Sequence, residues 1–127
     1  MAIRTELTLR LDNAPGALAR LCRALRDEKV NVLALGLDAS GVLHVVPDNP
    51  VHAAGLLRGR EYAVEQREVL YVTVPNGPGA LASATRMLSA SGVNIDYAFA
   101  SALADHDMAA VVVGVDDAQR AATAAGM

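Results

Sequence analysis

The first part of the chain changes from one hydrophobic pattern to another. Leu7, Leu9 and Leu11 alternate with polar residues, which is the period-2 pattern of a strand with one buried face. The segment Asn-Ala-Pro-Gly at residues 13–16 interrupts this alternation. From Pro15 onward the apolar positions recur every three or four residues, which predicts an amphipathic helix. Its expected apolar stripe consists of Leu18, Leu21, Cys22 and Leu25.

Four further elements follow this helix. Val30–Leu37 and Val42–Val46 are predicted strands with a turn at Ser40-Gly41 between them. Pro50 suits the first position of a second helix, and another strand begins at Tyr62. The order β-α-β-β-α-β is that of a ferredoxin-like unit, in which right-handed crossovers place both helices on one face of an antiparallel sheet.

An internal repeat extends this prediction to the rest of the chain. Residues 7–32 align without a gap on residues 70–95. Both copies contain Asn-x-Pro-Gly-Ala-Leu-Ala followed, at the same separation, by Val-Asn, which indicates duplication. The second copy predicts five elements: strands at Val69–Val74, Val93–Ala100 and Met108–Val115, and helices at Pro78–Ala90 and Asp116–Ala125.

We therefore predict an α+β protein of two tandem ferredoxin-like units, residues 1–68 and residues 69–127, each with an antiparallel sheet. The second unit lacks its last strand. That truncation would leave the strand Val69–Val74 without one neighbour, and an open apolar edge recruits another strand. We accordingly predict a homo-oligomer, most simply a two-fold homodimer.

Composition and charge exclude several classes of protein. With 53% hydrophobic and 20% charged residues the chain can form a core, and its net charge of −3 without a basic stripe argues against nucleic acid as a partner. No apolar run is long enough to span a membrane and the start does not resemble a signal peptide, so we expect a cytoplasmic protein. Cys22 is the single cysteine and is expected in the core. The three histidines are scattered, so we expect neither a metal site nor a cofactor.

The repeated motifs resemble those of the ACT domain family. In each copy a [Asp/Asn]-x-Pro-Gly-x-Leu loop follows the first strand, and Val-Asn-Val or Val-Asn-Ile opens the second strand. The resemblance covers almost the whole chain and implies small-molecule regulation, usually by an amino acid bound where two ACT units meet. The candidate ligand-binding residues are Asn13, Ala14, Pro15, Gly16, Ala17, Leu18 and Asn31 of the first copy, and Asn76, Gly77, Pro78, Gly79, Ala80, Leu81 and Asn94 of the second.

The chemistry of the loop residues fits that role. A glycine lets a ligand approach the backbone, and the N–H groups at the start of a helix favour a carboxylate. Asn13 and Asn76 can both donate and accept hydrogen bonds, as a zwitterionic ligand requires. By resemblance to the serine-binding ACT units of phosphoglycerate dehydrogenase, Asn31 and Asn94 would reach the ligand across an interface. The histidine of that family is replaced here by Leu11 and Val74.

These features predict an amino-acid-binding regulatory module without an attached catalytic domain, acting either on an enzyme in trans or as a ligand reservoir. We expect no catalytic activity, because neither copy offers paired His, Asp or Glu residues at matched positions. Two alternatives stay open: a small ferredoxin-like enzyme, and a purely structural assembly module. In the latter, the Asn-x-Pro-Gly loops would be no more than strand-to-helix turns.

Overall fold

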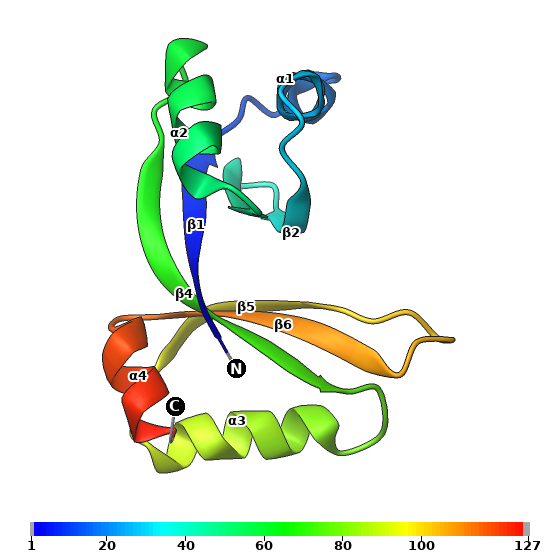
Figure 1. Ribbon diagram of the computed structural model, residues 1–127, viewed down its shortest axis with the longest axis vertical. Helices are drawn as coiled ribbons and strands as arrows, with labels where there is room; N and C mark the ends of the chain where they lie inside the picture. The colour runs from blue at the N-terminus through cyan, green and yellow to red at the C-terminus, as the bar shows by residue number, and fades with distance from the viewer. Residues whose placement is uncertain (1, 126–127) are drawn as a thin grey trace. The chain divides into compact units, whose positions relative to one another are not determined.

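The computed structural model describes residues 2–125 and forms two compact units (Figure 1). The N-terminal unit comprises residues 5–67, and the C-terminal unit comprises residues 68–125 together with residues 2–4. The predicted boundary between the two sequence copies, after residue 68, stays a prediction. The ends of those predicted ranges, residues 1, 126 and 127, lie outside the described residues.

The N-terminal unit is built on the strand order β2-β3-β1-β4. The strand β3 pairs antiparallel with β1, placing Leu43 opposite Leu9, and also antiparallel with β2. The two helices contact each other and share one core with β1, so both cover the same face of the sheet. The elements are β1 (Ala2–Arg10), α1 (Ala17–Asp27), β2 (Val32–Leu37), β3 (Val42–Pro47), α2 (Pro50–Gly59) and the beginning of β4 (Glu65–Pro75).

The C-terminal unit repeats this plan. Its strand β6 pairs antiparallel with β4 and β5, and both helices lie on one side of the strands (Figure 1). The core joins the strand residues Leu70 and Val113 to Leu88 of the first helix and Ala121 of the second. The elements after β4 are α3 (Ala80–Ala90), β5 (Ile95–Ser101), β6 (Met108–Val115) and α4 (Ala118–Ala124).

The beginning of β1 occupies the place of the strand that the second copy lacks. Residues 2–4 belong to the C-terminal unit, where Ile3 packs against the core and the Arg4 guanidinium lies 5.5 Å from the centroid of the Tyr71 ring. The strand order sets β1 beside β4, on the side opposite β6. The bare edge expected at Val69–Val74 is therefore wrong, because the chain covers that edge itself. The homodimer remains a prediction, but an open edge at β4 no longer supports it.

The predicted order of elements and the placement of both helices on one face are confirmed. The helices α1 and α3 begin two residues later than predicted, because Gly16 and Gly79 before them have φ angles of +84°. That left-handed conformation lies outside a right-handed helix and favours glycine. No helix in the described part is long and apolar enough to cross a membrane.

Two residues lie in environments that the hydrophobic pattern did not predict. Cys22 is exposed rather than in the core, because Ala17 and Ala24 extend the buried stripe of α1 toward the side away from Cys22. Glu6 is fully buried although it alternates with the core leucines of β1. Its Oε2 lies 3.2 Å from Nδ1 of His44 and accepts a hydrogen bond of 3.4 Å from the Thr8 hydroxyl. Both faces of the sheet are thus buried at this point.

Candidate functional site

The two Asn-x-Pro-Gly loops have the same backbone geometry. In the first loop Ala14 N donates to Asp12 O, and Ala17 N donates to Ala14 O. In the second loop Gly77 N and Ala80 N make the equivalent bonds to the carbonyls of Pro75 and Gly77. Each glycine that precedes a helix has a φ angle of +84°, and nothing lies within 4 Å of where a Cβ would stand. The shared motif therefore sets one open turn in both copies.

Each turn leaves the start of its helix uncapped. No side chain caps α1 or α3, and neither helix has an acidic residue in its first turn. At α1 the N–H groups of Leu18 and Ala19 have no partner among the described residues. Such N–H groups carry partial positive charge and can bind a carboxylate.

The first loop borders a small cavity of about 80 Å³. Asn13 and Leu18 line it from the loop side, and Asp38 and Gly41 line it from the turn between β2 and β3. Asn13 is exposed, and its side chain makes no hydrogen bond to any residue that the structure describes. The Asn13 amide thus keeps both its donors and its acceptor available to a ligand.

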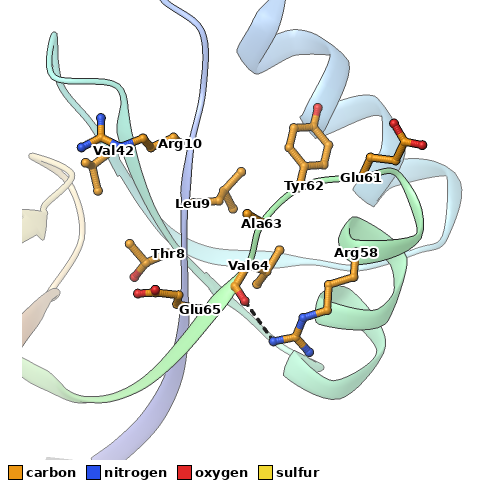
Figure 2. Close-up of a pocket in the computed structure, with 10 residues that line it drawn as sticks. All are labelled: Thr8, Leu9, Arg10, Val42, Arg58, Glu61, Tyr62, Ala63, Val64 and Glu65. Carbon is orange, nitrogen blue, oxygen red and sulfur yellow. Dashed lines mark hydrogen bonds between the residues drawn. The ribbon is translucent and has the colours of Figure 1, made fainter.

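Two larger cavities continue from the first loop along β1. One of about 220 Å³ adjoins the loop and includes Asp12 and Arg20 in its lining. The other, of about 720 Å³, shares Arg10 and Tyr62 with it (Figure 2). In Figure 2 the Arg10 side chain extends to the side of β1 away from Tyr62, and the bond that Arg58 donates to the Val64 carbonyl at 3.0 Å is also drawn. The first loop therefore opens onto a recess lined by charged and aromatic side chains.

The second loop has a different environment. The side-chain nitrogen of Asn76 donates to the carbonyls of Leu103 at 2.7 Å and His106 at 2.9 Å, and its backbone N–H donates to Asp107 O at 2.8 Å. All three acceptors lie in the segment between β5 and β6. Both side-chain donors of Asn76 are thus used within the protein, and only its oxygen is left for a ligand.

The asparagines of the Val-Asn motifs lie away from the loops of their own units. Asn31 precedes β2 and its backbone makes two hydrogen bonds with Asp48: its N–H donates to the side-chain Oδ1 of Asp48 at 3.1 Å, and its carbonyl accepts from Asp48 N at 2.9 Å. Leu37, at the other end of β2, lines the cavity beside Asn13. Six strand residues separate the two ends by about 20 Å. Asn94 likewise precedes β5 and is exposed. The role of both asparagines stays a prediction.

The turn beside the first loop contains a carboxylate with a lowered pKa, that of Asp38. The Asp38 carboxylate accepts hydrogen bonds from the Ser40 hydroxyl and, at 2.8 Å, from the Ser40 backbone N–H. These two bonds, the hydroxyl bond being the larger cause, hold the pKa of Asp38 below its ordinary value of 3.8. Asp38 is therefore an anion at neutral pH and fixes the turn that borders the cavity.

Within residues 2–125 no group of three or more His, Cys, Asp or Glu side chains could hold a metal ion. His106 lies in the segment between β5 and β6, where its backbone N–H donates to the Leu103 carbonyl. The pair of buried Glu6 and half-buried His44 was missed, because strand alternation alone assigns Glu6 to solvent.

Solved structures similar to this chain share its two-unit architecture. Protein BT0572 from Bacteroides thetaiotaomicron is 29% identical, with a TM-score of 0.86 over 96% of this chain and 85% of that one. The regulatory subunit of aspartate kinase from Thermus thermophilus is 17% identical, with a TM-score of 0.67 over 98% of this chain and 92% of that one. The equivalent subunit from Thermus flavus is 18% identical, with a TM-score of 0.61 over 98% and 93%.

Among curated protein sequences no significant match is found. The family model described as an ACT domain pair matches residues 1–125, which is almost the whole chain. ACT domains are regulatory domains rather than catalytic ones. With its tandem ferredoxin-like units and paired Asn-x-Pro-Gly loops, the chain belongs to the ACT domain pair family.

Proposed function

We propose that this protein is a regulatory module that binds a free amino acid at the loop following β1. The observation that carries the proposal concerns Asn13. Its side-chain amide makes no hydrogen bond to any described residue, and Asn13 lines a cavity at the uncapped start of α1. The α-carboxylate of the ligand would bind the N–H groups of Leu18 and Ala19. Its ammonium would bind the side-chain oxygen of Asn13.

Membership of the ACT domain pair family supports the regulatory part of this proposal. Occupancy of the first loop would be passed to an enzyme in trans, and the protein itself would have no catalytic activity. We also propose that the protein forms a homodimer and that Asn94 or Asn31 contributes to a site across an interface. A cytoplasmic location is part of the same proposal. The second loop is proposed to be the weaker site or no site, since Asn76 already holds the β5–β6 turn.

Calorimetry with each of the twenty amino acids tests the proposal. At least one is expected to bind the wild-type protein, and Asn13→Ala is expected to weaken that binding about tenfold, the effect of one or two lost hydrogen bonds to a charged ligand. Asn76→Ala, the matched change in the second loop, should leave the affinity of the folded protein unchanged. If none of the twenty binds, the protein is an assembly module. If turnover of a substrate is detected, it is an enzyme.

A further inference from the structure

The cavity of about 720 Å³ lies between β1 and the segment that precedes β4. Its lining includes Thr8 and Arg10 of β1 on one side and residues 62–65 on the other (Figure 2). The strand order sets β1 beside β4, but β4 begins only at Glu65, and residues 62–64 make no backbone hydrogen bond with β1 within residues 2–125. The sheet of the N-terminal unit is therefore open between β1 and residues 62–64.

The lining of this cavity comes from both faces of the sheet. Leu9 and Val64 belong to the core on the side of the helices. Thr8 and Arg10 also line the cavity, and strand alternation directs their side chains to the opposite face. A lining from both faces is expected of a gap between two strands rather than of a hollow on one face.

The backbone on each side of the gap has groups that an extended chain can pair with. Leu11 N donates to Gly41 O at 2.8 Å, and Leu9 lies opposite Leu43. Because bonding directions alternate along an antiparallel strand, the N–H and C=O of Arg10 point away from β3, toward the side of the cavity. Across the gap, Ala63 is exposed and its N–H and C=O have no backbone partner among the described residues. Such unpaired strand edges recruit another strand.

Two bonds connect the segment 62–64 to α2 instead of β1. The Arg58 guanidinium donates to the Val64 carbonyl at 3.0 Å, on the side of the segment away from β1 (Figure 2). Tyr62 N donates to Leu57 O at 3.1 Å. Both donors and acceptors other than residues 62–64 belong to α2, so these bonds hold the gap open.

The charged residues of the lining differ in whether they are bonded. Arg10 and Arg58 each donate to a backbone carbonyl of the protein at 3.0 Å. Glu61 and Glu65 are exposed and make no hydrogen bond or ion pair with any residue that the structure describes. A basic side chain of an incoming segment would therefore complement the unpaired carboxylates.

We propose that this gap binds an extended basic segment of a partner protein, which adds a strand between β1 and residues 62–64. In such strand addition, backbone hydrogen bonds supply affinity and alternate side chains supply specificity. Apolar side chains of the segment would face Leu9 and Val64, and a Lys or Arg between them would face Glu65 on the other side of the sheet. The proposal goes beyond amino-acid binding at the first loop and does not depend on it.

A ¹H–¹⁵N NMR titration of the full chain, without any amino acid, tests the proposal. The probe is the peptide acetyl-Thr-Val-Lys-Val-Thr-amide, which has strand-forming residues and one central base. We expect saturable shifts of the amides in residues 8–11 and 61–65. The same peptide methylated at the lysine backbone nitrogen lacks one donor for strand pairing and should bind at least tenfold more weakly.

A charge exchange tests the contribution of Glu65. Glu65→Lys should weaken binding of the lysine peptide about tenfold and strengthen binding of the matched peptide that has glutamate in place of lysine. Glu28→Lys is the control, because it makes the same change of charge at an exposed position that does not line the cavity. Equal effects of the two substitutions would show attraction by net charge alone and would overturn the assigned contact.

The remaining outcomes also decide the proposal. No shifts at millimolar peptide, shifts confined to residues 32–37 at the edge strand β2, or equal binding of the methylated peptide would overturn it. Shifts of residues 61–65 on dilution of the protein alone would overturn it as well, because a second copy of the chain would then fill the gap. Since no amino acid is present, each of these results leaves the proposed function of the first loop standing.

Discussion

The two Asn-x-Pro-Gly loops share a sequence and a backbone but differ in what surrounds them. In the N-terminal unit Asn13 projects toward a cavity bordered by the turn between β2 and β3, and its amide has no partner among the described residues. In the C-terminal unit Asn76 holds the longer segment between β5 and β6 through three hydrogen bonds. The same asparagine is thus poised for a ligand in one copy and is part of the framework in the other.

The length of the neighbouring hairpin accounts for this difference. Residues 38–41 connect β2 to β3, whereas residues 102–107 connect β5 to β6. The shorter turn closes on itself, with Asp38 bonded to Ser40. It is joined to the end of β1 by the bond from the Arg10 guanidinium to Ser40 O at 3.0 Å and by the bond from Leu11 N to Gly41 O at 2.8 Å. The longer connection extends as far as Asn76 and uses its amide. A duplicated motif therefore conserves a turn, while its neighbours decide whether a site remains open.

The largest expected effect concerns the tight turn that leaves the first site open. Gly41 has a φ angle of +86°, and a Cβ there would stand 2.8 Å from the Leu11 carbonyl oxygen. Gly41→Ala is expected to destabilise the protein by about 2–4 kcal/mol, combining left-handed strain with a backbone clash. Gly92→Ala is the control, because φ is +70° there but the space is open, and should cost about 1–2 kcal/mol. Urea denaturation of both variants measures the difference, and equal losses would contradict the role of the close contact.

The next effect separates the two asparagines by stability. Asn76→Ala leaves the carbonyls of Leu103 and His106 without their donor, and we expect it to lower the free energy of unfolding by about 1–3 kcal/mol. Asn13→Ala removes no bond within the described protein and should change stability by less than about 0.5 kcal/mol. Chemical denaturation without ligand tests the contrast. Equal losses would show that both asparagines are structural.

The smallest effect is a pH dependence in the first turn. Because the pKa of Asp38 is lowered in the folded state, its contribution to stability is present above pH 3.8 and is lost as the pH falls through the folded pKa. Ser40→Ala removes the hydroxyl bond, the larger cause of the shift, and should raise the pKa of Asp38 toward 3.8. A carboxyl NMR titration measures both values, and an unchanged pKa in the variant would refute the assigned cause.

The sequence predicted the fold in most respects because its strongest signals are local. Strand alternation in β1, the glycine-terminated turns and the repeat together were sufficient for the element order and for the ACT resemblance. They were insufficient for the beginning of β1, where Ile3 and Arg4 join the other unit. A local sequence pattern does not show whether all residues of a strand belong to one unit or whether its first residues belong to another.

The candidate site could be predicted only as a pair of motifs. Nothing in the Asn-x-Pro-Gly sequence indicates that the Asn76 side chain is bonded and that of Asn13 is not. The bonds of Asn76 go to residues that lie 27 and 30 positions further along the chain, where the motif carries no information.

The central claim is that the first loop binds an amino acid and the second does not. A ¹H–¹⁵N NMR titration of the full chain with the amino acid that binds most tightly in calorimetry tests it directly, because backbone amides from both loops are observed in one experiment. We predict saturable shifts of the amides in residues 11–20, including Leu18 and Ala19, and no comparable shifts in residues 74–83. Equal shifts in both loops, or shifts confined to residues 74–83, would contradict the account.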